Sequence, residues 1–125
     1  MEISANQVIK PVILKTIIGY EFLNYDEIIC VEANRKVTLV YIVNRDKPLM
    51  VFYNLLTIES LLSIPAFYRC HRSHIVNMRH IKGFLVKSHQ LVMINGNEIP
   101  ISEGRIRDFK ERFIPGNKFS RKAIA

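Results

Sequence analysis

Short apolar runs, broken at close intervals by turn-forming residues, are the feature that most restricts how this chain can fold. The runs at 12–18, 20–23, 26–33, 37–43 and 49–53 are rich in β-branched and aromatic residues, which favour strands. A helical protein would instead need longer segments with apolar residues spaced three and four apart. The pattern therefore predicts a domain that is mainly β.

Two segments instead predict short amphipathic helices. The first follows Asn54, a residue type that caps helices, and Pro65 ends it. The second follows Ser102, another capping residue type, and ends before Pro115. The domain is thus predicted to be mostly β with two short helices and no long recognition helix. The apolar residues that share one face are Leu55, Ile58 and Leu62 in the first helix and Ile106, Phe109 and Phe113 in the second.

A hairpin is predicted at Asn95-Gly96, which lies between apolar runs at 91–94 and 98–102. This dipeptide is typical of a two-residue type I′ turn, in which both residues have positive φ. Pro100 has no backbone N–H to donate. The strand that contains it is therefore predicted to lie at a sheet edge or a bulge.

Positive charge is concentrated in two parts of the chain, whose net charge is +7. No acidic residue lies between Glu59 and Glu98, although all four histidines fall there. A solvated basic face would explain the charge but not this exclusion of acids. Clustered positive charge favours a polyanionic partner, most often nucleic acid. The basic residues are Arg69, Arg72, Arg79, Lys82 and Lys87 in the first part and Arg105, Arg107, Lys110, Arg112, Lys118, Arg121 and Lys122 in the second.

The sequence carries no sign of export or membrane insertion. No apolar run approaches the ~20 residues that a membrane-spanning helix needs. The N-terminus lacks the compact apolar block of a secretory signal. Two cysteines are too few for a disulfide framework. We therefore expect a cytoplasmic protein with free thiols and no membrane partner.

The segment 67–84 combines a cysteine and three histidines with several basic residues. Cys70, His71, His74 and His80 have the residue types of a zinc site, and Cys70 alone has that of a thiol nucleophile. However, adjacent residues on a strand point to opposite faces, and no acid lies nearby to orient a histidine base. We expect no metal, no cofactor and no catalytic residue, and keep a metal- or thiol-dependent enzyme as the alternative.

The same segment also suits nucleic acid. His71, Arg72 and Ser73 offer a ring N–H, a planar guanidinium and a hydroxyl, which match phosphate oxygens and the guanine edge. Asn77 is placed to cap a turn through its amide. An RNA-binding β domain is a further alternative, although no stacking pair of aromatic residues accompanies the basic ones.

The residues 67–77, FYRCHRSHIVN, resemble the signature of the LytTR family of bacterial DNA-binding domains. The segments 26–33, 52–56 and 95–102 agree with the family in the same order along the chain. The resemblance covers about residues 10–114. It implies an elongated set of small antiparallel sheets with two short helices, in which loops enter the major grooves of DNA.

The resemblance also implies a function and a division of the chain. Family members usually follow a receiver domain in two-component systems, so this chain is expected to be a free-standing LytTR domain or a response regulator output domain. The expected function is sequence-specific binding of double-stranded promoter or operator DNA with repeated half-sites, as a homodimer and without enzymatic activity. The expected parts are an N-terminal extension (1–9), the DNA-binding domain (10–114) and a basic C-terminal tail (115–125).

Three segments carry the DNA contacts that the resemblance implies. The loop at 34–36 matches the first base-reading loop, and residues 71–73 match the second, with Ser73 on phosphate. The third follows Ser102, where the family places basic residues but this chain has Glu103 before its first arginine. The predicted DNA-binding residues are Asn34, Arg35, Lys36, Arg69, His71, Arg72, Ser73, Asn77, Lys87, Arg105 and Arg107.

Two neighbours of the second loop have open roles. Arg69 is expected either to contact phosphate or to pair with a structural acid. His74 occupies a position that is usually aromatic in the family, so it is expected to pack within the domain rather than to contact DNA.

Overall fold

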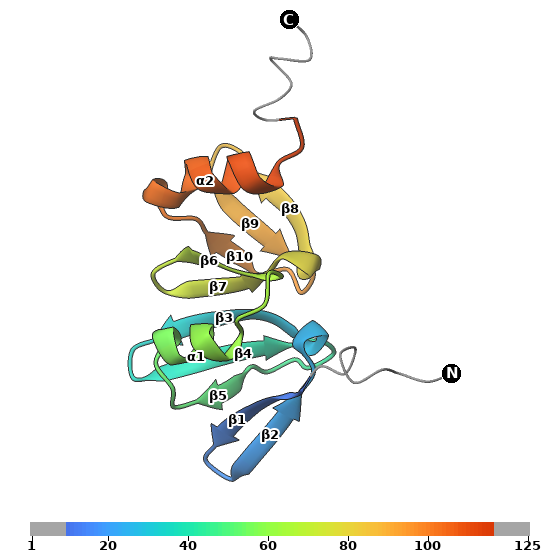
Figure 1. Ribbon diagram of the computed structural model, residues 1–125, viewed down its shortest axis with the longest axis vertical. Helices are drawn as coiled ribbons and strands as arrows, with labels where there is room; N and C mark the ends of the chain where they lie inside the picture. Colours follow the sequence, from blue (N-terminus) through green and yellow to red (C-terminus); the bar gives the residue numbers. More distant parts are fainter. Residues whose placement is uncertain (1–9, 117–125) are drawn as a thin grey trace, which may run out of the picture.

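The computed structural model of the chain describes residues 10–116 (Figure 1). The predicted N-terminal extension (1–9) and residues 117–125 of the predicted basic tail lie outside the described residues. Three antiparallel sheets follow one another along the long axis of the molecule, accompanied by two α-helices (Figure 1). The predicted fold class, an elongated and mainly β domain with two short helices, is therefore confirmed.

Each sheet has its own strand order. In the two-stranded sheet, β1 (Val12–Thr16) pairs with β2 (Gly19–Leu23). The central sheet has the order β5-β4-β3-β7-β6 and comprises β3 (Ile28–Asn34), β4 (Val37–Ile42), β5 (Leu49–Val51), β6 (Phe67–His71) and β7 (His74–Asn77). The third has the order β10-β9-β8 and comprises β8 (Ile81–Leu85), β9 (Gln90–Met93) and β10 (Glu98–Pro100).

The central sheet carries a hydrophobic core on each of its faces, because successive strand residues point to opposite sides. Val31 and Ile75 face the first core, which also contains residues of the β1–β2 hairpin and of helix α1 (Leu55–Leu61). Their neighbours Cys30 and Val76 face the second core, between the central sheet, the third sheet and helix α2 (Glu103–Phe113). Both cores therefore support β3 and β7, the strands in the middle of the sheet.

The two helices begin directly after Asn54 and Ser102 and bury the predicted faces, but the Ser102 side chain makes no capping hydrogen bond. The Asn54 side chain accepts a hydrogen bond from the Thr57 amide (2.8 Å), and Leu55, Ile58 and Leu62 are buried. In α2, Phe109 is buried, and Ile106 and Phe113 pack against the second core. No helix within residues 10–116 is long and apolar enough to cross a membrane.

The β9–β10 hairpin forms where Asn95-Gly96 predicts it, but the predicted type I′ turn is wrong. Leu91 pairs with Ile99, and both are buried. A two-residue turn would shift this register by one residue and move Ile99 to the outer face. The loop instead has three residues, 94–96, and Gly96 alone takes a positive φ (+91°) within it. Pro100 lies on an edge strand, as predicted.

Candidate nucleic-acid interface

Three chain segments that are distant in sequence lie along one side of the molecule. They are the β3–β4 turn, the β6–β7 turn and the start of α2, all on the left in Figure 1. The Ala33 amide donates to the Ser73 carbonyl (2.8 Å), which joins the first two turns. The Ser102 amide donates to the Cys70 carbonyl (3.0 Å), which joins the third. The structure thus brings together all three segments expected to contact DNA.

The β3–β4 turn exposes a guanidinium and an ammonium at its tip. Asn34 pairs with Val37, so that Arg35 and Lys36 form a two-residue turn, and all three polar residues are exposed. Arg35 has a φ of +59°. Residues other than glycine seldom adopt this left-handed conformation, which costs free energy. The exposed Arg35 side chain at this position is therefore a candidate for a functional role.

The β6–β7 turn presents a different set of donors. Arg72 is exposed at the tip, whereas His71 and Ser73 are partly buried. The Ser73 amide donates to Nδ1 of His71 (3.0 Å). In the neutral ring the proton is therefore on Nε2, which remains available as a directed hydrogen-bond donor.

His74 supports this turn from within the domain. Its ring packs edge-on against that of His71, with 5.4 Å between centroids. Nδ1 of His74 is buried and has no hydrogen-bond partner in the part of the chain that the structure describes. Burial lowers the pKa of His74, and the opposing effect of Glu32 is smaller. His74 is therefore neutral at pH 7 and packs within the domain, as expected.

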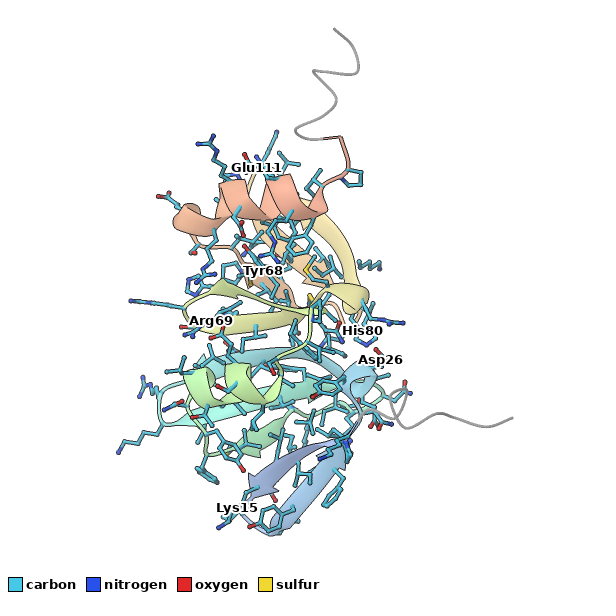
Figure 2. All side chains as sticks on the ribbon, in the orientation of Figure 1. Lys15, Asp26, Tyr68, Arg69, His80 and Glu111 are labelled. Atoms are coloured by element: carbon cyan, nitrogen blue, oxygen red, sulfur yellow. The ribbon has the colours of Figure 1, made fainter. Side chains whose placement is uncertain are left out.

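Arg69 links the β6–β7 turn to helix α1 (Figure 2). Its Nη1 lies 2.9 Å from Oε1 of Glu59, and its Nη2 donates to the Arg72 carbonyl (2.7 Å). The Arg69 side chain is only 21% exposed. Of its two expected roles, the structure favours pairing with an acid. No local sequence pattern indicates that Glu59 is the partner, because the two residues belong to different elements.

Asn77 has a structural role in place of the predicted DNA contact. It is 1% exposed. Its Nδ2 donates to the Ile28 carbonyl (2.9 Å), and its Oδ1 accepts from the Arg79 amide (3.0 Å). The predicted turn capping by its amide is therefore confirmed, but the side chain is not accessible to DNA.

The start of α2 carries charges of both signs. Glu103 and Arg105 are exposed, and Arg105 has no ion-pair partner among residues 10–116. Arg107 lies 3.4 Å from Glu111, but its side chain is 91% exposed, so this pair contributes little and leaves the guanidinium accessible. In the first turn of α2, Glu103 is thus the acidic residue and Arg105 is the basic one.

Lys87 lies in the β8–β9 turn, next to the start of α2. The carbonyl of His89 in this turn accepts a hydrogen bond from the Ile101 amide (3.0 Å), one residue before the α2 cap. Lys87 is exposed. It is therefore placed to add positive charge near the third segment.

Helix α2 is anchored to β6, the strand that leads into the Arg72 turn (Figure 2). The Tyr68 hydroxyl donates to Oδ2 of Asp108 (2.8 Å), and the Arg112 guanidinium lies 5.2 Å from the Tyr68 ring centroid. Burial and the adjacent Asp108 raise the pKa of Tyr68 to about 12, so the hydroxyl remains a donor. Sequence reasoning missed this anchor, since no local pattern connects Tyr68 to α2.

The alternative thiol or metal site does not assemble. Cys30 and Cys70 are free and fully buried, and burial raises the pKa of each thiol to about 12. Reactive cysteines have the opposite shift. No group of three or more potential metal ligands occurs within residues 10–116.

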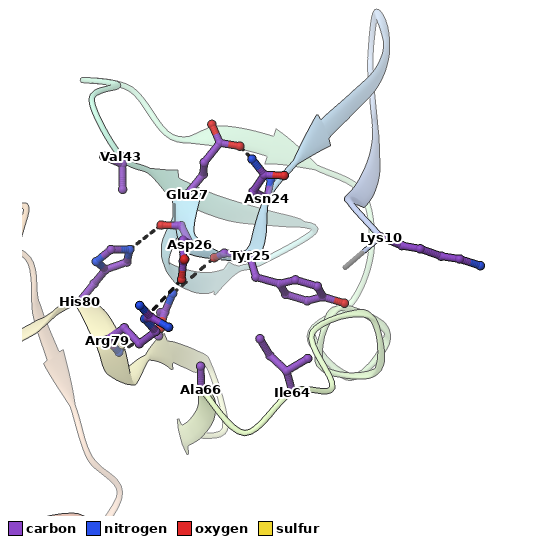
Figure 3. Close-up of a pocket in the computed structure, with 11 residues that line it drawn as sticks. Lys10, Asn24, Tyr25, Asp26, Glu27, Val43, Ile64, Ala66, Arg79 and His80 are labelled. Carbon is purple, nitrogen blue, oxygen red and sulfur yellow. Dashed lines mark hydrogen bonds and ion pairs between the residues drawn. The ribbon is translucent and has the colours of Figure 1, made fainter. Parts of the chain in front are cut away.

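A pocket of about 520 Å³ lies beside the 3₁₀ turn Tyr25–Glu27, at the end of β3 away from the three turns (Figure 3). Most of its polar groups pair with one another. Arg79 lies 3.4 Å from the Asp26 carboxylate, and the His80 ring contacts the Asp26 carbonyl. The pocket thus offers no convergent set of free polar groups for a small ligand.

Comparison with known proteins gives a consistent result. The family model of the LytTr DNA-binding domain matches residues 19–114. A solved structure from Bacillus cereus, described as the LytTr DNA-binding domain of a response regulator, is 33% identical with a TM-score of 0.70. The match covers 83% of this chain and 96% of that one. Among curated proteins, none matches the chain.

Proposed function

Because the chain belongs to the LytTR family of DNA-binding domains, we propose that it binds a specific double-stranded DNA sequence as a bacterial transcription regulator. The observation that carries this proposal is that the β3–β4 turn, the β6–β7 turn and the start of α2 lie on one side of the domain. We call these three segments the three turns. Residues 10–114 form the DNA-binding unit. Its sites are promoter or operator sequences with repeated half-sites, which it reads in the cytoplasm.

The order of the turns along the long axis defines how a duplex would lie. The β3–β4 turn, the β6–β7 turn and the start of α2 follow one another in this direction (Figure 1). A duplex parallel to the long axis meets all three, and protruding turns enter its grooves more readily than a flat sheet face. Within residues 10–116, the cations of this side that have no ion-pair partner are Arg35, Lys36, Arg72, Lys87 and Arg105.

Different side chains have different roles in this arrangement. The Arg72 guanidinium can bond O6 and N7 of one guanine, so we assign it base readout. His71 provides one hydrogen bond from Nε2 and no charge when neutral. Ser73, together with Arg105 and Lys87, supports binding through phosphate contacts, which position the protein without reading sequence.

Selection from random duplexes, followed by anisotropy titrations of variants, tests the proposal. Arg72→Ala should weaken binding to the selected duplex by about 1–3 kcal/mol and leave a scrambled duplex nearly unaffected. The contribution of charge is tested with Lys36→Ala, which should reduce the affinity for DNA. The salt slope, by which we mean the steepness with which log K falls with log[salt], should decrease by about 0.9. Lys47→Ala is the matched control, because Lys47 is exposed in the turn at the opposite end of β4.

Two results would contradict the proposal. Equal weakening of both duplexes by Arg72→Ala would make Arg72 a phosphate contact and remove the base-readout assignment. Selection that yields no enriched sequence, with Lys36→Ala and Lys47→Ala behaving alike, would exclude sequence-specific binding through this side of the domain.

A further inference from the structure

The first turn of helix α2, which carries Arg105, is only weakly fixed by its own residues. The Ser102 side chain makes no capping hydrogen bond, so it leaves the first amides of the helix without a side-chain acceptor. Gly104 follows, and glycine is among the poorest helix formers. A backbone hydrogen bond from the Ser102 amide to the Cys70 carbonyl (3.0 Å) ties the cap to β6. The place of the Arg105 side chain therefore depends on contacts further along the helix.

One turn later, three side chains connect α2 to β6. Oδ2 of Asp108 accepts a hydrogen bond from the Tyr68 hydroxyl (2.8 Å) and lies 3.5 Å from Nη1 of Arg112. The Arg112 guanidinium in turn lies 5.2 Å from the centroid of the Tyr68 ring. Each of the three side chains thus contacts the other two, and we call them the α2 network. Figure 2 shows Tyr68 beneath the helix.

The α2 network restricts rotation of the helix about its own axis. Below the helix, the Tyr68 ring packs against Phe109 and Phe113, with 5.9 and 5.1 Å between centroids. Hydrophobic contacts are non-directional, so they hold the helix on the core but resist a small roll only weakly. A hydrogen bond requires a direction as well as a distance. The Tyr68–Asp108 bond is therefore the contact that defines which side of α2 faces the β6–β7 turn.

Arg105 lies on the same side of α2 as Asp108. Residues three apart are neighbours on a helix surface. Burial raises the pKa of both Cys70 and Tyr68, and the positive charge of Arg105 is among the effects that oppose this rise, so its guanidinium lies near β6. Arg105 has no ion-pair partner within residues 10–116. Its charge is therefore available to a phosphate beside the strand that leads into the Arg72 turn.

A small roll of α2 is enough to move Arg105 out of contact. A helical side chain extends about 6 Å from the helix axis, so a roll of roughly 20° displaces its end by about 2 Å. Charge-assisted hydrogen bonds tolerate only a few tenths of an ångström in the distance between donor and acceptor. Loss of rotational control would therefore break a phosphate contact without removing any charge from the protein.

We propose that Tyr68 and Asp108 are positioning residues for DNA binding, because their hydrogen bond fixes the rotation of α2 and holds the Arg105 guanidinium against a phosphate. Neither residue touches DNA in this arrangement. The inference rests on the proposed function, which assigns Arg105 a phosphate contact.

The substitution Tyr68→Phe tests the role of the hydroxyl, because it keeps the ring. In anisotropy titrations of the full chain, affinity for the selected duplex should fall about three- to tenfold, as for loss of one charge-assisted contact. The salt slope should also fall, by up to about 0.9, although no cation is removed. The matched control is Tyr53→Phe beside the first core, where the hydroxyl accepts from the Lys15 amide (3.2 Å). This variant should bind DNA as the wild type does.

A double-mutant cycle identifies the residue through which the hydroxyl acts. In the Arg105→Ala background, Tyr68→Phe should change affinity by less than about twofold, because no guanidinium remains to be positioned. A hydroxyl that only stabilised the fold would weaken both backgrounds equally when lost. The cycle should give the same result on a scrambled duplex, since phosphate contacts do not depend on sequence. It therefore decides the inference even when selection yields no enriched sequence and the proposed sequence specificity fails.

The carboxylate is tested with two substitutions of Asp108. Removing an acid from a DNA-binding surface ordinarily tightens binding. Asp108→Ala should instead weaken it about as much as Tyr68→Phe does. Asp108→Asn should restore nearly wild-type affinity, because its amide oxygen still accepts from the Tyr68 hydroxyl. The control is Glu111→Ala, which removes an acid from the same helix, one that lies 3.4 Å from Arg107, and should bind at least as tightly as the wild type.

Three results would overturn the inference. One is a Tyr68→Phe variant with the affinity and salt slope of Tyr53→Phe. Another is equal weakening by Tyr68→Phe with and without the Arg105 side chain. The third is tighter binding by Asp108→Ala, matching Glu111→Ala, which would mean that the carboxylate acts through its charge alone. A wild-type chain that binds no duplex at all would instead refute the proposed function, and the inference with it.

Discussion

Replacing Glu59 with glutamine should weaken DNA binding, although Glu59 lies on α1 and outside the three turns. Its carboxylate holds the Arg69 guanidinium, which in turn donates to the Arg72 carbonyl at the tip of the β6–β7 turn. Glu59→Gln keeps the shape of the side chain but removes the charge. Arg69 is then held less firmly, and the turn that carries Arg72 becomes less ordered.

The size of the effect follows from the exposure of the pair. The side chains of Arg69 and Glu59 are 21% and 43% exposed, and partly exposed pairs of this kind contribute about 0.5–1 kcal/mol. If this free energy is fully coupled to DNA binding, Glu59→Gln weakens affinity about two- to fivefold. Arg69→Ala also removes the charged hydrogen bond to the carbonyl, about 1.5–3 kcal/mol, and should weaken it by roughly ten- to a hundredfold.

Anisotropy titrations at several salt concentrations distinguish positioning from direct contact. A phosphate contact by Arg69 would predict the opposite sign, because Glu59→Gln would free the guanidinium and tighten binding. Glu98→Gln is the control for the gain in net charge, since Glu98 is exposed on the edge strand β10 and has no ion-pair partner within residues 10–116. Tighter binding by Glu59→Gln than by Glu98→Gln, or a salt slope lowered by about 0.9 in Arg69→Ala, would refute the positioning role.

Three further predictions concern other parts of the domain. Arg35→Gly should change the free energy of unfolding by less than about 1 kcal/mol, because relief of the backbone strain at positive φ offsets the added flexibility of the unfolded chain. It should nevertheless weaken DNA binding. A denaturant titration measures the first effect and a binding titration the second. Glu103→Arg should tighten binding to selected and scrambled duplexes alike, and unchanged affinity for both would place the start of α2 away from DNA. Burial raises the pKa of Cys30 and Cys70 to about 12, above the ordinary 9.0, so folding favours the protonated thiols. Stability should therefore be complete below about pH 9 and fall as pH rises above it, and thiol-reagent labelling at pH 8 should be slow until the chain unfolds.

The sequence was sufficient for the fold class because strands and helices are encoded locally. The apolar runs, the Asn54 cap and the apolar face of α2 each depend on residues close together in the chain. The β9–β10 turn shows the limit. The Asn95-Gly96 pattern favours one turn type, but burial of Leu91 and Ile99 determines the register and requires another.

The candidate site was predictable only in part for a similar reason. The motif at 67–77 identifies a functional segment but does not separate residues that face outward from those that hold the segment in place. Asn77 was predicted to contact DNA, yet its amide bonds the Ile28 carbonyl on a strand far away in the sequence. The acid that pairs with Arg69 is likewise set by the packing of α1 against the central sheet, which no local pattern specifies.

The strand order of the central sheet has a consequence for folding kinetics. Among the described strands, β3 and β7 are the one neighbouring pair that is not consecutive in the chain. Hairpins of consecutive strands form within microseconds, whereas pairing β7 with β3 must first close a long loop. The Ala33–Ser73 hydrogen bond, which joins the first two turns, belongs to this slow step. We therefore expect DNA-binding competence to appear in refolding later than β-sheet circular dichroism, and simultaneous recovery of the two signals would contradict this order.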